Sequence, residues 1–331
     1  MASVAEAFTP TPHFSPEQGG LVGYDPRQMA SLFSILSLPL GAVANLETAV
    51  AATQPWVKGD HGHESYDFGL NDDQRNALWG IYHARDMVEQ RALPAGHYDQ
   101  ILVFGAVHIG NDKRLAYLRN TFEGGDVSTD RIVLLGGERA MFPEREPEDV
   151  AQSIASVLQK QHADTWFQKF IQKSPEAIDE TDLLRLAALD HLGPMVLKQL
   201  RLHIGEELKW RTKTPVVRTE FGWQGVPLTL SHSRAHPRKD GDPRHTTESC
   251  VVDWLIELQP KLGSKVAIIG SQPHLDRMTM TVQRVLHGKG REDIQITAGG
   301  PNTTDATGHT IYLGEIARAE YERLQLLQSR L

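Results

Sequence analysis

Cysteine is nearly absent from this sequence, since the 331 residues contain only Cys250. A single cysteine excludes an intrachain disulfide and any zinc site built from several cysteines, and it fits a reducing compartment. An excess of positive charge is also absent, because 34 lysines and arginines face 42 acidic residues and the formal net charge is −8. This balance argues against a protein that binds the nucleic-acid backbone. It leaves room for a small anionic ligand held by a local group of donors.

Long hydrophobic runs are missing as well. The most apolar segment, "SLFSILSLPLGAVA" at 31–44, is shorter than the roughly 20 residues of a membrane span and contains Pro39. It predicts a buried helix followed by a turn. The first twenty residues lack the basic start and apolar core of a signal peptide, so we expect a loosely held tail there. Together these absences predict a cytoplasmic protein with no membrane partner.

Several catalytic motifs cannot be found. The sequence contains neither the GxSxG nucleophile elbow nor the GxxxxGK[ST] phosphate loop, and "GAVHIG" lacks the glycine spacing of a dinucleotide-binding fingerprint. The segments "DHGHE" at 60–64 and "SHSRAHPR" at 231–238 contain metal-ligand residue types. Neither presents them on one face of a helix, as a metalloprotease motif does, so we predict no metal site.

What is present is an alternation of strand and helix patterns. Helical spacing at 26–52 and 71–92 is followed by apolar strand-like runs, each leading into a helical segment. The five runs are "QILVFG", "RIVLLGG", "GVPLTLS", "KVAIIG" and "DIQITA". Such alternation is typical of an α/β protein. We therefore predict a Rossmann-like, mostly parallel five-stranded sheet with helices on both faces.

Two additions accompany this predicted sheet. Residues 1–97 form an N-terminal tail and helical extension, and residues 98–331 form the Rossmann-like domain. Within the domain, about 142–215 is predicted to be a helical insertion, without strands from 163 to 210 and broken or kinked near Gly193 and Pro194.

Three of the predicted strands leave the sheet through glycine and then present polar side chains. In open parallel sheets the ligand lies outside the carboxyl ends of the strands, where helix N-termini point unpaired N–H groups at it. A glycine after a strand is often only a turn, and Arg114 and Arg277 could each pair instead with a helix carboxylate such as Asp112 or Asp276. The residues at the three exits are Gly105, His108 and Arg114; Gly136, Gly137, Glu138 and Arg139; and Ser271, His274 and Arg277.

These exits predict one shared pocket for a nucleotide-like or phosphorylated molecule. Glycine backbone, hydroxyl groups and paired guanidinium hydrogen bonds suit an anion, and groups whose pKa can be tuned near neutrality suit proton transfer. The binding candidates are Gly105, Arg114, Gly136, Gly137, Thr246, Ser271 and Arg277, and the catalytic candidates are His108, Glu138, Glu248 and His274. Thr246 and Glu248 are equally explained as the cap and first turn of a helix. The residues leave open whether bonds are broken; an enzyme here would be a transferase or hydrolase.

The order of these pieces resembles the SanA/YdcF/ElyC-like domain family of bacteria. "YDQILVFGAVHIGNDKRLAYL" matches the family's Asp-led strand, glycine and following arginine, and "RIVLLGGERA" matches a Ser-Gly-Gly strand end, with Leu135 in place of serine. "QGVPLTLS" supplies the Gly-Val-Pro, and "HTTESC" a Thr-x-Glu-Asn helix start with Ser249 in place of asparagine. "IIGSQPHLDR" supplies the last histidine and arginine. The resemblance covers about 98–140 and 222–330.

The resemblance implies a Rossmann-like fold and a site at the matched residues. Family members include membrane-anchored envelope proteins linked to polysaccharide and peptidoglycan metabolism, and a soluble protein described as binding S-adenosylmethionine. The missing anchor places this chain with the soluble, YdcF-like type. The resemblance thus offers S-adenosylmethionine as one candidate, while the residues themselves leave the cofactor unknown.

A second hypothesis comes from the helical additions. "WFQKFI" at 166–171 and the apolar spacing of 179–204 would suit the surface of a non-catalytic interaction or regulatory protein, or of a homo-oligomer. The same spacing is found more often in a core.

Overall fold

The chain forms two compact units. The computed structural model describes residues 25–57, 68–137, 139–140, 146–203, 216–233, 246–302 and 307–330, with side chains outside 196–217. Unit 1 comprises Met1–Arg91, Gln272–Glu292 and Asn302–Leu331, and unit 2 comprises Ala92–Ser271 and Asp293–Pro301. The helices at Leu275–Gly288 and His309–Ser329, each of which follows a strand, therefore belong to unit 1 together with the N-terminal helices. The predicted division kept these two helices with the sheet.

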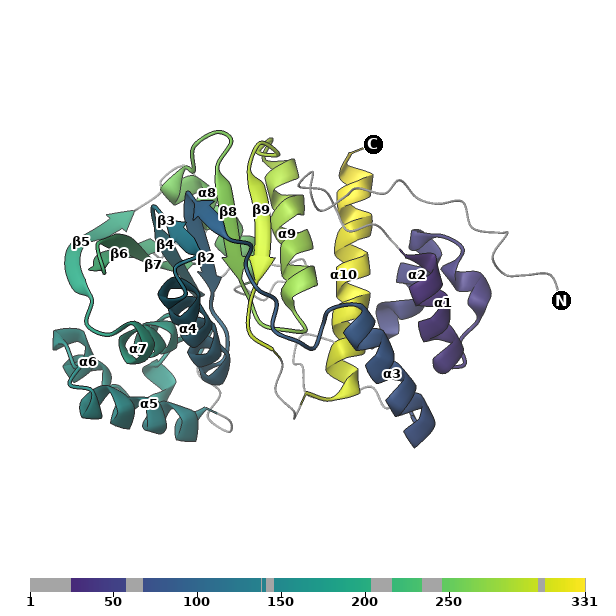
Figure 1. Ribbon diagram of the computed structural model, residues 1–331, viewed down its shortest axis with the longest axis horizontal. Helices are drawn as coiled ribbons and strands as arrows, with labels where there is room; N and C mark the ends of the chain where they lie inside the picture. Colours follow the sequence, from purple (N-terminus) through teal and green to yellow (C-terminus); the bar gives the residue numbers. More distant parts are fainter. Residues whose placement is uncertain are drawn as a thin grey trace. The chain divides into compact units, whose positions relative to one another are not determined.

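Unit 2 is built on a seven-stranded sheet in the order β5-β6-β7-β4-β2-β8-β9 (Figure 1). The strands are β2 (Gln100–Phe104), β4 (Ile132–Gly137), β5 (Val196–His203), β6 (Val216–Trp223), β7 (Val226–Ser233), β8 (Lys265–Ile269) and β9 (Gln295–Gly299). Along the sheet, the neighbours in the run β7-β4-β2-β8-β9 all pair in parallel. By contrast, β5 pairs with β6, and β6 with β7, in the antiparallel sense. A separate parallel pair joins β1 (Gly96–Tyr98) to β3 (Val127–Thr129).

The parallel strands follow the doubly wound order. From β2 the chain moves outward to β4 and β7, then returns to the other side of β2 to form β8 and β9. The strand order therefore reverses between β2 and β8, which is the switch point where such sheets bind ligands. Right-handed crossovers place α4 (His108–Glu123) and α8 (Thr247–Leu258) on opposite faces. All five residues of β2 are buried, as a strand covered on both faces requires.

The α/β class and the parallel pairing of the five predicted strands are confirmed, but the prediction of a five-stranded sheet is wrong. β5 lies in the segment that we predicted to be helical without strands. Gly193 has a φ of 80° and Pro194 follows it, so the two residues end α7 (Glu180–Leu192) instead of kinking it. Beyond them, polar and apolar residues alternate in "QLRLH" at 199–203, which is the period of a strand. Gln224 and Gly225, both with positive φ, then make the tight turn between β6 and β7.

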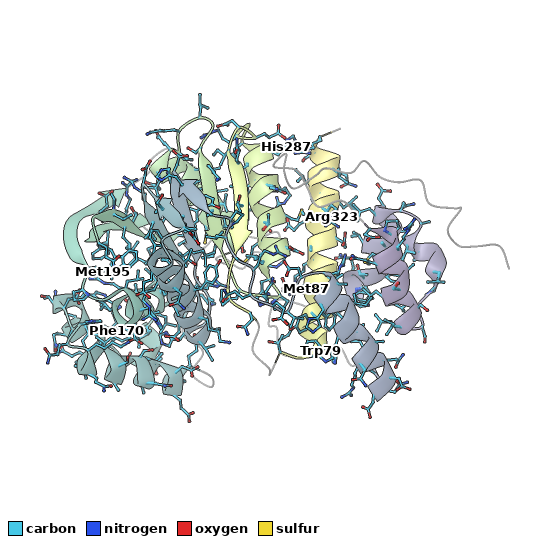
Figure 2. The ribbon with its side chains drawn as sticks, viewed as in Figure 1. Trp79, Met87, Phe170, Met195, His287 and Arg323 are labelled. Carbon is cyan, nitrogen blue, oxygen red and sulfur yellow. The ribbon has the colours of Figure 1, made fainter. Side chains whose placement is uncertain are left out.

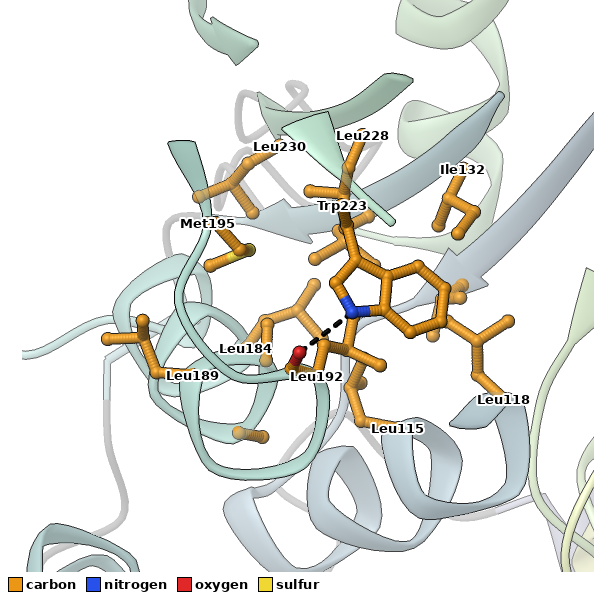
Figure 3. Packing of buried hydrophobic residues seen from close by; sticks show 14 of the residues in the cluster. Leu115, Leu118, Ile132, Leu184, Leu189, Leu192, Met195, Trp223, Leu228 and Leu230 are labelled. Carbon is orange, nitrogen blue, oxygen red and sulfur yellow. Dashed lines mark hydrogen bonds between the residues drawn. The ribbon is translucent and has the colours of Figure 1, made fainter. Parts of the chain in front are cut away.

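The helical insertion packs into the core of unit 2. Its helices are α5 (Pro147–Gln159), α6 (Thr165–Phe170) and α7. Figure 3 shows Trp223 of β6 among leucines of α4 and α7, and its Nε1 donates a hydrogen bond of 2.7 Å to the carbonyl of Leu192. The apolar side chains of α7, together with Phe167 and Phe170, are buried. These buried side chains are not available as part of a partner surface, whereas Ile171 of the same "WFQKFI" segment is 42% exposed.

Unit 1 is helical. It contains α1 (Pro26–Ile35), α2 (Leu46–Thr53), α3 (Asp72–Ala84), α9 (Leu275–Gly288) and α10 (His309–Ser329). The predicted helix at 26–52 is two helices with a 3-10 turn at Leu40–Val43 between them, and the helix predicted at 71–92 ends at Ala84. Tyr82 stacks on Tyr312 with ring centroids 4.3 Å apart, and Trp79, labelled in Figure 2, meets Tyr312 edge-on.

Within the described residues, no helix has the length and apolar character needed to cross a bilayer. The predicted N-terminal tail, the "DHGHE" segment and Glu138 lie outside the described residues.

Candidate functional site at the carboxyl ends of the strands

Arg114 lies at the switch point of the sheet in unit 2. Its Nη1 donates to the carbonyls of Phe104 (2.6 Å) and Gly105 (2.9 Å) at the end of β2, and its Nε donates to Ser271 Oγ (2.9 Å) beyond β8. The side chain is buried. The structure thus brings together three of the predicted binding residues, and Arg114 joins the ends of the two strands between which the order reverses.

The glycines at the strand ends are required by α7. A Cβ at Gly105 would lie 2.3 Å from Oε1 of Glu180, and a Cβ at Gly136 would lie 2.8 Å from Cα of Thr181. The carbonyl of Gly137 accepts a hydrogen bond of 3.3 Å from Thr181 Oγ1. Close backbone approach was the predicted role of these glycines. The group that approaches is the first turn of α7 instead of an external ligand.

Two buried carboxylates and one arginine lie beside these glycines. Arg139 Nε donates to Glu180 Oε2 (3.0 Å), and Arg139 Nη1 lies 3.7 Å from Glu146 Oε2. Both glutamates are buried, whereas 26% of the Arg139 side chain is exposed. We call Gly105, Arg114, Arg139, Glu146, Glu180 and Ser271 the strand-end cluster. The sequence did not single out Glu146 or Glu180, because both lie in the insertion and only folding carries them to the sheet.

His108 begins α4 next to this cluster. Its backbone N–H donates to Glu146 Oε1 (2.6 Å), so an internal carboxylate already occupies the helix N-terminus that the sequence assigned to a ligand. Its Nε2 is 2.8 Å from Ser153 Oγ. Burial lowers the pKa of His108, although the charges of Asp112 and other carboxylates oppose this effect. His108 therefore favours the neutral form, buried away from solvent.

Thr246 and Glu248 open α8. Thr246 Oγ1 accepts from the Ser249 N–H (3.1 Å), and Ser249 Oγ accepts from the Thr246 N–H (2.9 Å). These reciprocal bonds form a capping box, so the serine that replaces the expected asparagine has a structural role. Glu248 is exposed in the first turn of the helix.

His274 and Arg277 belong to unit 1, where they meet one carboxylate. Arg277 Nε lies 2.6 Å and His274 Nδ1 lies 3.2 Å from Glu315 Oε2. Burial would raise the pKa of Glu315, but the charges of Arg277, His274 and Arg318 hold this pKa well below its ordinary value. Arg277, predicted to hold an external anion, and His274, predicted to transfer protons, thus both have an internal carboxylate as their partner.

A surface pocket in unit 2 lies at the amino ends of the parallel strands, opposite the strand-end cluster. It has a volume of about 240 Å³ and is lined by residues that include Asp99, Asp130, Arg131 and Lys261. Asp99 Oδ2 accepts from the Lys265 N–H (2.8 Å), which ties the start of β8 to the residue before β2. Asp99, part of the family-like motif, therefore aligns β2 with β8 at their amino ends, away from the strand-end cluster.

Comparison with protein-family models, curated proteins and solved structures finds no match to this chain.

Proposed function

We propose that unit 2 binds a small anionic molecule, nucleotide-like or phosphorylated, at the strand-end cluster. The observation that carries the proposal is Arg139, whose partly exposed guanidinium is held by Glu180 and Glu146 at the end of β4. A guanidinium oriented in this way needs little further ordering to take a phosphate or carboxylate with paired hydrogen bonds. Arg139 also lies near the switch point, which is where open α/β sheets bind ligands.

The mixture of groups in the cluster favours a nucleotide-like ligand over a simple anion. Arginine suits a phosphate, while buried carboxylates such as Glu180 are suited to accept hydrogen bonds from ribose hydroxyls. S-adenosylmethionine, which carries a carboxylate and a ribose, meets the same requirements and remains the alternative ligand. The buried position of His108 supports binding more than proton transfer, so no reaction is part of the proposal.

Membership of the SanA/YdcF/ElyC-like family is part of the proposal and is supported by where the motif residues lie. Gly105 follows β2, Gly136 and Gly137 end β4, Thr246 caps α8, and Arg277 is in the first turn of α9. Each motif thus falls at the strand end or helix start that the family pattern requires. The near absence of cysteine from the sequence, with Cys250 alone and buried, supports a reducing compartment such as the cytoplasm as part of the proposal.

Exchange of Arg139 for glutamine tests the binding site. We expect ADP or S-adenosylmethionine to raise the melting temperature of the full-length protein, and Arg139→Gln to weaken binding about ten- to hundredfold, the cost of one charged hydrogen-bonding group. Arg131→Gln is the matched control, because Arg131 precedes the same strand, β4, and lines the pocket at the opposite edge. The proposal fails if neither compound stabilises the protein, or if both variants weaken binding equally.

A further inference from the structure

A polar seam runs between α4, α5 and α7 in unit 2. His191 Nε2 of α7 lies 2.5 Å from Asp112 Oδ1 of α4. Asp190, the preceding residue, receives hydrogen bonds at Oδ1 from Ser156 of α5 (2.6 Å) and from Lys160, which follows α5 as its C-cap (2.5 Å). Asp190 is buried, and the side chain of His191 is 14% exposed. The seam therefore collects two carboxylates and an imidazole from helices that are far apart in sequence.

The three side chains have the arrangement of metal ligands. One ligand atom from each of Asp112, Asp190 and His191 lies within 4.8 Å of the other two, and this is the one such group among the residues that the structure describes. Within that part of the chain, Oδ2 of neither aspartate accepts a hydrogen bond. Each carboxylate therefore has an oxygen left for a further partner.

Among the described residues, two imidazole nitrogens in the seam lack the partner that a buried polar atom requires. His191 Nδ1 is buried and has no hydrogen-bond partner among the described residues, and the same holds for Nδ1 of His108, one turn before Asp112 on α4. A buried polar atom left without a partner costs about 1–3 kcal/mol. His191 Nε2 and Asp112 Oδ1 already lie 2.5 Å apart, so a metal ion that takes the place of the proton between them would bind both atoms, and the ring proton would then lie on Nδ1.

We propose that Asp112, Asp190 and His191 bind a first-row divalent transition metal ion, for which Zn²⁺ is the probe. Imidazole combined with carboxylates suits Zn²⁺ and its neighbours, whereas Ca²⁺ and Mg²⁺ prefer sites made of oxygen ligands alone. Water would complete the coordination. The site lies at the end of α7 away from Glu180, so it is independent of the strand-end cluster, and an ion there would tie the insertion to α4.

Lys160 distinguishes this proposal from a plain network of ion pairs. Its ammonium neutralises Asp190 at 2.5 Å and therefore competes with a bound cation. In a metal site, Lys160→Gln removes a like charge and strengthens metal binding. In a purely structural network, the same change removes a stabilising partner and gives no gain in metal affinity. The Lys160 side chain is 40% exposed, so we expect the variant to fold.

Competition for Zn²⁺ with a chromophoric chelator, on full-length protein stripped of metal, measures the affinity directly. We expect His191→Gln and Asp112→Asn each to weaken Zn²⁺ binding by roughly tenfold or more, and Lys160→Gln to strengthen it. Added Zn²⁺ should raise the melting temperature of the wild type and not of His191→Gln. Asp112, with 38% of its side chain exposed, provides the second variant if His191→Gln does not fold.

Two controls separate this site from histidines elsewhere. His97 pairs with Asp130 at 3.3 Å on an exposed part of unit 2, so His97→Gln should leave Zn²⁺ affinity unchanged. The double variant His61→Gln/His63→Gln tests the "DHGHE" segment in the same way. The proposal is overturned if the wild type does not bind Zn²⁺, if His191→Gln and Asp112→Asn bind it as well as the wild type, or if Lys160→Gln binds it no better.

Discussion

Replacement of Arg277 by alanine is expected to lower the free energy of unfolding by about 3–5 kcal/mol, because it leaves a buried carboxylate short of its main partner. Arg277 Nε lies 2.6 Å from Glu315 Oε2, and only 3% of the Glu315 side chain is exposed. His274 and Arg318 remain near the carboxylate in the variant, so the loss is of one cation among three. Chemical denaturation, followed by circular dichroism, measures the change.

Arg284→Ala is the matched control. Arg284 and Glu322 lie two turns further along α9 and α10 and form the same Nε to Oε2 contact at 2.6 Å, but the Glu322 side chain is 16% exposed. An ion pair with this much contact to water contributes about 1 kcal/mol or less. Equal losses of stability in the two variants would contradict the role assigned to the burial of Glu315.

The effect of Arg277→Ala also depends on pH. Since the pKa of Glu315 in the folded protein is held far below its ordinary value of 4.5, ionised Glu315 contributes stability above about pH 4.5 and loses it as the pH falls. Removal of Arg277 raises this pKa toward its ordinary value. The deficit of the variant should therefore be largest at neutral pH and shrink in acid below about pH 4.5.

The same variant decides between the two roles of Arg277. If Arg277 holds an external anion, Arg277→Ala weakens ADP or S-adenosylmethionine binding while stability changes little. If it holds Glu315, stability falls and affinity in the folded fraction is unchanged. The distances in unit 1 support the second outcome.

Replacement of Trp223 by alanine is expected to destabilise unit 2 by about 3–5 kcal/mol, since it deletes a large buried ring. The indole is 3% exposed and meets the ring of Phe122 edge-on. Its N–H donates to the carbonyl of Leu192 (Figure 3). For a unit of this size the loss corresponds to a melting temperature lower by roughly 6–20 °C. Differential scanning calorimetry measures it.

Two further variants calibrate this result. Trp223→Phe retains most of the apolar contact but leaves the Leu192 carbonyl without its donor, so we expect a loss of about 1–3 kcal/mol. Leu262→Ala removes an apolar side chain that is 82% exposed and should be close to neutral. A melting temperature for Trp223→Ala as high as that for Leu262→Ala would show that β6 and the end of α7 are not held by this contact.

The strands of the parallel sheet could be read from the sequence because burial on both faces demands continuous apolar runs. "QILVF" and "KVAII" are such runs, and both are central strands. The turn residues that end them, Gly105 and Gly270, were equally visible. β5 was missed, because its alternation of polar and apolar residues follows directly on a strong helical pattern and was absorbed into it.

Pairs of distant charges could not be read in this way. Arg139 meets Glu180, Arg277 meets Glu315, and Asp112 meets His191 only when helices distant in sequence pack together. Each of these side chains is also an ordinary surface residue by type. Nothing local distinguishes a charged residue that will be buried with a partner from one that will face water.

The sequence by itself determined the α/β class, the alternation of the five parallel strands with helices, the start of α8 and the positions of the glycine exits, because local periodicity and backbone sterics set these features. The tertiary structure alone decided which group each exit meets. At Gly105 and Gly136 that group is the first turn of α7, at the start of α4 it is Glu146, and at Arg277 it is Glu315. The physical reason is that a buried charge or an unpaired helix N-terminus requires a partner but does not specify from which part of the chain, so only the packing of the insertion and of α10 supplies the answer.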